Sequence, residues 1–150
     1  MSAANPAPVV VGVDGSPQSL AAVEAGMEQA RLRDAPLHVV HCADVTPATL
    51  HLKGGVTMST RDIASQQHQE VWEKINPSIE STDLDVTTVE LNGYPADELA
   101  DHCAESGAVV LVLGSRGRGR IRAAVLGSTS MRSLENAPCD VLIAKGASTA

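Results

Sequence analysis

The stretch VVVGVDGSP, residues 9–17, contains the two local signals on which the predicted fold depends. Val9–Val13 is almost wholly apolar, which is typical of a central parallel strand covered by helices on both faces. Ser16 and Pro17 then open a helix, because serine caps free backbone amides and proline has no N–H to leave unpaired at the first helical position. The stretch therefore predicts a buried strand, a short turn and a helix.

The same alternation of strand and helix continues to the end of the chain. Apolar runs predict five strands, at Val9–Val13, Leu37–Cys42, Asp85–Leu91, Val109–Leu113 and Asp140–Ala144. Strands that alternate with helices imply right-handed crossovers and an α/β fold. We therefore predict an open, mainly parallel five-stranded sheet with helices on both faces, a Rossmann-like arrangement. The mixed polarity of residues 85–91 favours an edge position for the third strand.

Four helices are expected between these strands. They span about Ser16–Asp34, Thr60–Asn76, the stretch after Pro95, and Ser128–Leu134. We expect the second helix to stop at Pro77, because proline lacks the N–H that continues a helix. Residues 43–59 predict a mobile, irregular loop over one end of the sheet, and loops of that length in a compact domain are often functional.

The composition excludes several classes of protein. The 150 residues, 43% of them hydrophobic, fit one domain over residues 1–150, with residues 1–7 expected to be disordered. Eleven basic against 18 acidic residues leave a net charge of −7, so the chain is a poor general partner for nucleic acid or an anionic membrane. The sequence contains no Phe, one Trp (Trp72) and one Tyr (Tyr94), which disfavours a platform for stacking bases.

The cysteines and apolar runs indicate the cellular compartment. Cys42, Cys103 and Cys139 form no CxxC pair, which is ordinary usage in a reducing cytoplasm. The N-terminus lacks the basic start and long apolar stretch of a signal peptide. The longest apolar run, residues 108–113, is far shorter than a membrane span. We therefore expect a cytoplasmic protein with no membrane partner.

Two loops are predicted at the carboxyl edge of the sheet, where open α/β sheets bind ligands. The first is Gly12–Ser16, directly after the first strand. The second runs from Gly114 to Ser130 and is rich in glycine, which lets backbone amides approach an anion closely. Its last residues, 127–130, open a helix whose N–H groups and hydroxyls favour a phosphate.

Arginines crowd the second loop. Half of the eight arginines in the chain lie within seven residues, at Arg116, Arg118, Arg120 and Arg122. This local positive field favours a polyanionic ligand. The alternative from the residues alone is a solvated basic loop before an ordinarily capped helix. A tract that touches RNA is disfavoured, because the loop lacks aromatic residues and lies in an acidic chain.

Asp14 ends the first strand and allows several roles. Its carboxylate can accept hydrogen bonds from ribose hydroxyls, bind a metal, be phosphorylated or form an ordinary Asp-Gly-Ser turn. The sequence lacks the dinucleotide G-x-G-x-x-G after this strand, the Walker pattern, a receiver aspartate after the third strand and a G-x-S-x-G elbow. No catalytic residue is therefore assigned.

The histidines predict no metal site. His38 and His41 are three residues apart on a strand, so their side chains are expected on opposite faces. Ligand spacing is likewise absent at His51, His68 and His102. We interpret Cys42 as a small buried side chain in preference to a redox sensor.

The spaced glycines and their surroundings resemble the universal stress protein family. Gly114-x2-Gly117-x9-Gly127-Ser128 is similar to the nucleotide-binding signature of that family, and the strand into Asp14 resembles its opening. Residues 37–42 resemble the second strand of that family, and residues 93–99 resemble the start of its third helix. Residues 136–143 resemble its C-terminal segment. The likeness covers nearly the whole chain in the right order. It implies the adenine nucleotide α-hydrolase-like version of the fold.

The resemblance implies a homodimer, joined through the last strand, that binds ATP or a related adenine nucleotide. Asp14 would contact the ribose, the Cys42 backbone would border adenine, and Mg²⁺ could bridge the phosphates. The whole implied site is Gly12, Val13, Asp14, Cys42, Gly114, Arg116, Gly117, Gly127, Ser128, Thr129 and Ser130. Asp140 stands where the family often has proline, which bears on how the last strand pairs.

Four functions are consistent with these features. The leading hypothesis is an ATP-binding regulatory protein of the stress response, because no positioned general base and no phosphoryl clamp is evident. The alternatives are a cyclic AMP-binding protein of the same fold, a slow Mg-dependent ATPase, and a dimeric interaction module without a ligand.

Overall fold

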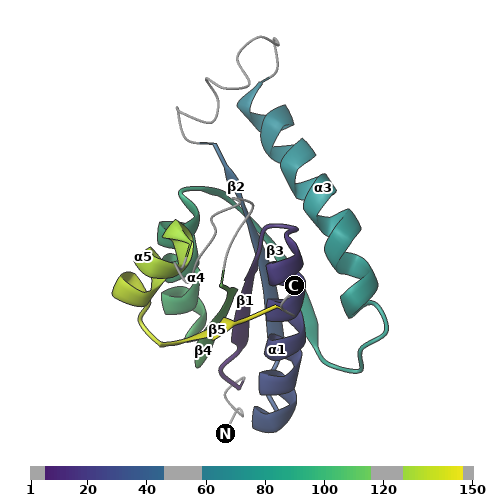
Figure 1. Cartoon of the computed structure of the whole chain (residues 1–150), viewed down its shortest axis with the longest axis vertical. Coiled ribbons are helices and arrows are strands. Elements are labelled where there is room, and N and C mark those ends of the chain that lie inside the picture. Colours follow the sequence, from purple (N-terminus) through teal and green to yellow (C-terminus); the bar gives the residue numbers. More distant parts are fainter. Residues whose placement is uncertain (1–5, 46–58, 116–126, 147–150) are drawn as a thin grey trace, which may run out of the picture.

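The predicted alternation of strands and helices is confirmed by a computed structural model, which describes residues 6–45, 59–115 and 127–146 (Figure 1). The elements in chain order are β1 Val9–Val13, α1 Pro17–Arg33, β2 Leu37–Asp44, α3 Thr60–Ile79, β3 Val86–Gly93, α4 Pro95–Ser106, β4 Val110–Gly114, α5 Ser128–Asn136 and β5 Asp140–Ala144.

The five strands form one parallel sheet in the order β3-β2-β1-β4-β5. The chain moves outward from β1 through β2 to β3 and then returns to β4 on the other side of β1. The strand order therefore reverses between β1 and β4, which is where open sheets of this type bind ligands. β3 lies at an edge, as the polarity of its sequence predicts.

Helices cover both faces of this sheet, α1 and α3 on one side and α4 and α5 on the other (Figure 1). Val9 and Val11 of β1 share an apolar cluster with Val71 of α3. Val10, the residue between them, belongs to a second cluster with Leu99 of α4. Successive side chains of a strand point to opposite faces, so one apolar strand supplies both cores.

The ends of α1 follow from its terminal residues. The Ser16 hydroxyl accepts a hydrogen bond from the Ser19 N–H at 3.2 Å, and Pro17 occupies the first helical position, as predicted. At the other end, Asp34 adopts a left-handed conformation with φ of 51°. Its N–H donates to the carbonyl groups of the last helical turn, which stops the helix there.

The predicted end of β2 at Cys42 is wrong, because the strand continues through Asp44. β2 pairs with β3 along its whole length, up to Asp44 opposite Gly93. The Gln67 amide of α3 also accepts from the Asp44 N–H at 3.0 Å and donates to the Asp44 carbonyl at 3.2 Å. The first residues of the predicted irregular segment 43–59 are thus strand, and residues 46–58 lie outside the described ranges.

The predicted stop of the second helix at Pro77 is also wrong, because α3 runs through it to Ile79. Proline has a φ that suits a helix, and its missing N–H removes a single bond in the last turn. The Glu80 N–H donates to the Asn76 carbonyl at 3.0 Å, and Ile79 packs against the core. α5 likewise continues two residues beyond the predicted end, to Asn136.

Candidate functional site

The ends of β1 and β4 and the first turn of α5 form the edge of the sheet where the strand order reverses. The Gly127 N–H, at the N-cap of α5, donates to the Ser115 carbonyl at 3.2 Å. The Ser130 hydroxyl donates to the Gly114 carbonyl at 2.9 Å. These two bonds hold the start of α5 against the end of β4.

Two glycines of the predicted site are required by close packing. A Cβ on Gly114 would lie 2.7 Å from the Gln18 carbonyl oxygen, so glycine lets β4 approach the first turn of α1. A Cβ on Gly12 would lie 2.7 Å from Leu113 Cδ2 and 3.0 Å from Leu99 Cδ1. Gly12 therefore makes room in the core on the α4 side of the sheet. Sequence reasoning missed this packing role.

Asp14 lies in the turn between β1 and α1. Its Oδ1 accepts a hydrogen bond from the Ser16 N–H at 2.9 Å. Gly15 between them has φ of +82°, a conformation that favours glycine. The turn interpretation of Asp14 is therefore confirmed. A carboxylate has two oxygens with several lone pairs, so this bond is compatible with a further acceptor role.

Cys42 lies at the same level of the sheet as Asp14. The register places Val13 opposite His41, and the pairing of β1 with β2 ends at these two residues. Asp14 and Cys42 are the next residues along the two segments, so they lie at the same level just beyond the last pair. Cys42 is 9% exposed, and burial, followed by nearby carboxylates, raises the pKa of its thiol to about 12. A protonated thiol is a poor nucleophile, so Cys42 fits the predicted packing role.

The first turn of α5 has no side-chain cap at its N-cap, because that residue is Gly127. Ser128 is exposed and Thr129 is half-buried, so both hydroxyls lie at or near the surface. Ser130 differs, because it is 5% exposed and its hydroxyl hydrogen is used in the bond to β4. Its contribution to an anion site is therefore its backbone N–H.

The other predicted residues of the glycine motif fall in a stretch that the structure does not describe. Arg116, Gly117 and the arginines of residues 118–122 lie outside the described ranges. The described members lie near the carboxyl ends of β1, β2 and β4, in the turn after β1, or at the N-cap and first turn of α5; they are Gly12, Val13, Asp14, Cys42, Gly114, Gly127, Ser128, Thr129 and Ser130.

Four histidines form two pairs that sequence reasoning missed. His38 Nδ1 lies 3.1 Å from His102 Nε2 of α4, and His41 Nδ1 lies 2.7 Å from His68 Nδ1 of α3. The predicted placement of His38 and His41 on opposite faces of β2 is confirmed. Their partners are 64 and 27 residues away in sequence, so no local pattern could reveal them. Within residues 6–45, 59–115 and 127–146, no three His, Cys, Asp or Glu side chains are arranged to hold a metal ion.

Comparison with known proteins identifies the family. The family model described as the universal stress protein family matches residues 7–145. The chain belongs to the universal stress protein family. Among curated members, universal stress protein MJ0531 of Methanocaldococcus jannaschii is 28% identical over 91% of this chain and 81% of its own length.

Solved structures confirm the Rossmann-like α/β fold of this universal stress protein. The structure of hypothetical protein MJ0577 matches with a TM-score of 0.77 at 16% identity, over 95% of this chain and 97% of that one. A universal stress protein in complex with cAMP matches with a TM-score of 0.60 at 25% identity, over 95% and 98%. Among the helices that the structure describes, none has the length and apolarity needed to cross a membrane.

Proposed function

We propose that this universal stress protein binds an adenine nucleotide at the carboxyl edge of its sheet and regulates through that binding. The start of α5 is the observation that supports this most. A glycine N-cap, beside the reversal of strand order, leaves the first-turn amides without a side-chain cap. These N–H groups and the helix dipole favour an anion. The likeness to a universal stress protein solved with cAMP supports an adenine nucleotide as the ligand class.

Each part of the nucleotide has a matching group in this proposal. The phosphates bind the amides of residues 128–130, together with Arg116 and Gly117 of the glycine motif. The Asp14 carboxylate accepts hydrogen bonds from the ribose hydroxyls. The Cys42 backbone borders the adenine ring, because the pairing of β2 with β1 ends just before this residue. Mg²⁺ would accompany the phosphates as a counter-ion.

ATP is the first candidate among adenine nucleotides, because the arginine-rich segment 116–122 supplies positive charge for several phosphates. Cyclic AMP is the second, and the cAMP-bound relative is the observation that favours it. Denaturing natively purified protein and identifying the released nucleotide by mass spectrometry distinguishes them. Competition between ATP and cyclic AMP in a titration shows whether one site takes both.

We also propose that the protein is a homodimer joined through β5. This strand forms one edge of the sheet, and the outer backbone groups of an edge strand are available to a second copy. Asp140, the first residue of β5, is exposed and places a charge at one end of that edge. Sedimentation of the full chain tests the assembly, since a monomer at all concentrations contradicts it.

The variant Gly127→Asp tests the anion site with little risk to the fold. Aspartate at an N-cap accepts hydrogen bonds from the same amides that the phosphate needs, and it stabilises a helix start. We expect the Kd for ATP to rise at least about tenfold, or 1.4 kcal/mol, in isothermal titration calorimetry. The melting temperature should stay the same or rise slightly.

Thr60→Asp is the matched control, because it adds the same charge at the first turn of a different helix, α3. We expect its affinity for ATP to equal that of the wild type. Wild-type affinity in Gly127→Asp would show that the start of α5 does not bind the phosphates.

A further inference from the structure

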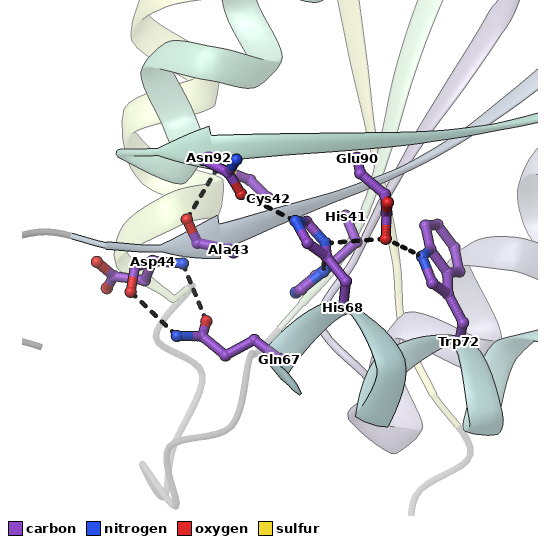
Figure 2. A network of polar contacts seen from close by, with 9 residues as sticks. All are labelled: His41, Cys42, Ala43, Asp44, Gln67, His68, Trp72, Glu90 and Asn92. Carbon is purple, nitrogen blue, oxygen red and sulfur yellow. Dashed lines mark hydrogen bonds and ion pairs between the residues drawn. The ribbon is translucent and has the colours of Figure 1, made fainter. Parts of the chain in front are cut away.

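His41 and His68 form a buried imidazole pair between β2 and α3 (Figure 2). The two residues are 5% and 6% exposed. Their Nδ1 atoms lie 2.7 Å apart, and the rings meet edge to face with centroids 4.7 Å apart. Two ring nitrogens at this distance share one hydrogen, because one must donate an N–H and the other must accept with a lone pair.

The surroundings of His68 determine which ring donates. His68 Nε2 lies 2.9 Å from the Asn92 Oδ1 of β3, which is an acceptor, so Nε2 carries a hydrogen. In the neutral ring, His68 Nδ1 then has a lone pair, and the His41 Nδ1–H donates to it. The neutral pair is therefore fully hydrogen-bonded along this contact.

A first added proton can be accommodated without moving either ring. In the singly protonated pair, His41 carries its hydrogen at Nε2, and the hydrogen between the rings lies on His68 Nδ1. The His68 imidazolium then donates to His41 through Nδ1 and to Asn92 through Nε2. Glu90 Oε2 of β3 lies 3.7 Å from His68 Nδ1, which places a carboxylate beside the new positive charge (Figure 2).

A second added proton has no such place. Both Nδ1 atoms would carry hydrogens that face each other across 2.7 Å, and two like charges would be buried together. The charged groups on α3 and at the carboxyl ends of the neighbouring strands are Asp14, Asp44, Arg61, Asp62, Glu70, Glu73 and Lys74, and those on α3 are exposed. His38 of β2 lies on the opposite face of the sheet, against His102. The structure shows the Glu90 carboxylate in contact with the pair, and this contact is with His68.

We propose that His41 and His68 titrate as one unit that binds a single proton while α3 remains packed on β2, and that a second proton separates the two elements. The contact between α3 and β2 is therefore sensitive to pH. The pair lies outside the residues assigned to the nucleotide, so the device operates with or without a bound ligand.

Trp72 supplies a local reporter of this protonation. It is the only tryptophan in the chain, and its Nε1–H donates to Glu90 Oε2 at 2.9 Å (Figure 2). Its ring meets the His41 ring edge to face, with centroids 6.2 Å apart. A charge on the imidazole pair therefore changes the surroundings of the indole, and its fluorescence follows the titration.

Proton uptake by the full chain tests the shared titration. Potentiometric titration from about pH 8 to 4.5 covers the range in which imidazoles titrate, and circular dichroism monitors the helices in parallel. While helicity is native, the wild type should bind one proton more than the double variant His41→Gln/His68→Gln. Each single variant should also bind one more, through its remaining imidazole. An uptake of two protons, or of none, by the wild-type pair at native helicity overturns the proposal.

Glu90→Gln tests the same unit without removing either imidazole. Glutamine keeps an acceptor for the Trp72 N–H but loses the charge beside His68. We expect the midpoint of the Trp72 fluorescence transition to move to lower pH, since a carboxylate 3.7 Å from His68 Nδ1 favours the charged imidazole. Glu105→Gln, an equal charge change on α4 at the opposite face of the sheet, should leave it unchanged. An unshifted midpoint in Glu90→Gln overturns the placement of the charge on His68.

Discussion

Asp14 combines a structural contact with the contact to ribose that we propose. Its Oδ1 holds the turn between β1 and α1 through the Ser16 N–H. Because this bond orients the carboxylate at the carboxyl edge of the sheet, one residue both shapes the turn and presents an acceptor there. Removing the side chain should therefore affect binding and stability together, and an isosteric change should separate the two effects.

Asp14→Ala should weaken ATP binding by about 10- to 100-fold, because hydrogen bonds to a charged group contribute about 1.5–3 kcal/mol each. Isothermal titration calorimetry measures the affinity and urea unfolding the stability. Asp14→Asn is the control, since its amide oxygen still accepts from the Ser16 N–H and preserves the turn. If Asp14→Ala binds ATP as tightly as the wild type, the carboxylate has no part in binding.

The buried thiols should be unreactive in the folded protein. Burial, followed by the neighbouring Cys139 thiol, raises the pKa of Cys103 to about 12, and burial does the same for Cys42. A thiol with that pKa is only about one part in 100,000 thiolate at pH 7, and the thiolate is the reactive form. We expect mass spectrometry to find both thiols unmodified after iodoacetamide treatment of native protein and alkylated after denaturation. Rapid alkylation of native Cys42 would instead support a redox role.

β2 and α3 show how contacts elsewhere in the fold extend an element beyond its own sequence signal. Ala43 and Asp44 continue β2 because β3 pairs with them and Gln67 of α3 bonds both backbone groups of Asp44. Pro77 is tolerated in α3 because it lies in the last turn and the following Ile79 packs on the core. Both boundaries depend on contacts that are distant in sequence, so patterns along the chain could not locate them.

Gly26 allows α1 to lie close to β1, and Gly26→Ala should destabilise the protein. A Cβ at this position would overlap Val11 Cγ2 and lie 3.4 Å from Leu37 Cδ1. Overpacking of this kind typically costs about 1–3 kcal/mol, which outweighs the helix preference for alanine over glycine of about 1 kcal/mol. Urea unfolding measures the change.

Glu28→Ala, at an exposed position of the same helix, is the control for Gly26→Ala. We expect the free energy of unfolding of this control to change by no more than about 0.5 kcal/mol. A Gly26→Ala variant more stable than the wild type would show that α1 can move away from β1 without loss of packing.

The folded protein as a whole should lose stability in mild acid. Burial lowers the pKa of both His38 and His102, and each ring also lies beside the other. Between about pH 6.5, where histidines of the unfolded chain become protonated, and the lower pKa values of the folded rings, the unfolded state binds more protons. The free energy of unfolding should therefore fall as the pH drops below about 6.5 and level off below the folded pKa values.

Urea unfolding of the wild type at pH 7.5, 6.5 and 5.5 measures this dependence. The double variant His38→Gln/His102→Gln should show a shallower fall over the same range, because it lacks the two groups. An equally steep fall in the double variant would assign the acid sensitivity to other groups.

Several features of the molecule could be predicted from the sequence because their causes are local. Strand and helix alternate with the hydrophobic pattern, Ser16 and Pro17 start α1, and the polarity of β3 marks it as an edge strand. The glycine motif and Asp14 likewise carry the resemblance to the universal stress protein family, which the family match confirms. Short-range chemistry along the chain is sufficient for all of these.

Only the tertiary structure decided which distant groups meet. It paired His38 with His102 and His41 with His68, committed the Ser130 hydroxyl to β4, and showed that Gly12 serves the core. The physical reason is that a hydrogen bond or a steric limit depends on two groups within a few ångströms. When folding brings those groups together across tens of residues, neither of them leaves a signal in its own neighbourhood of the sequence.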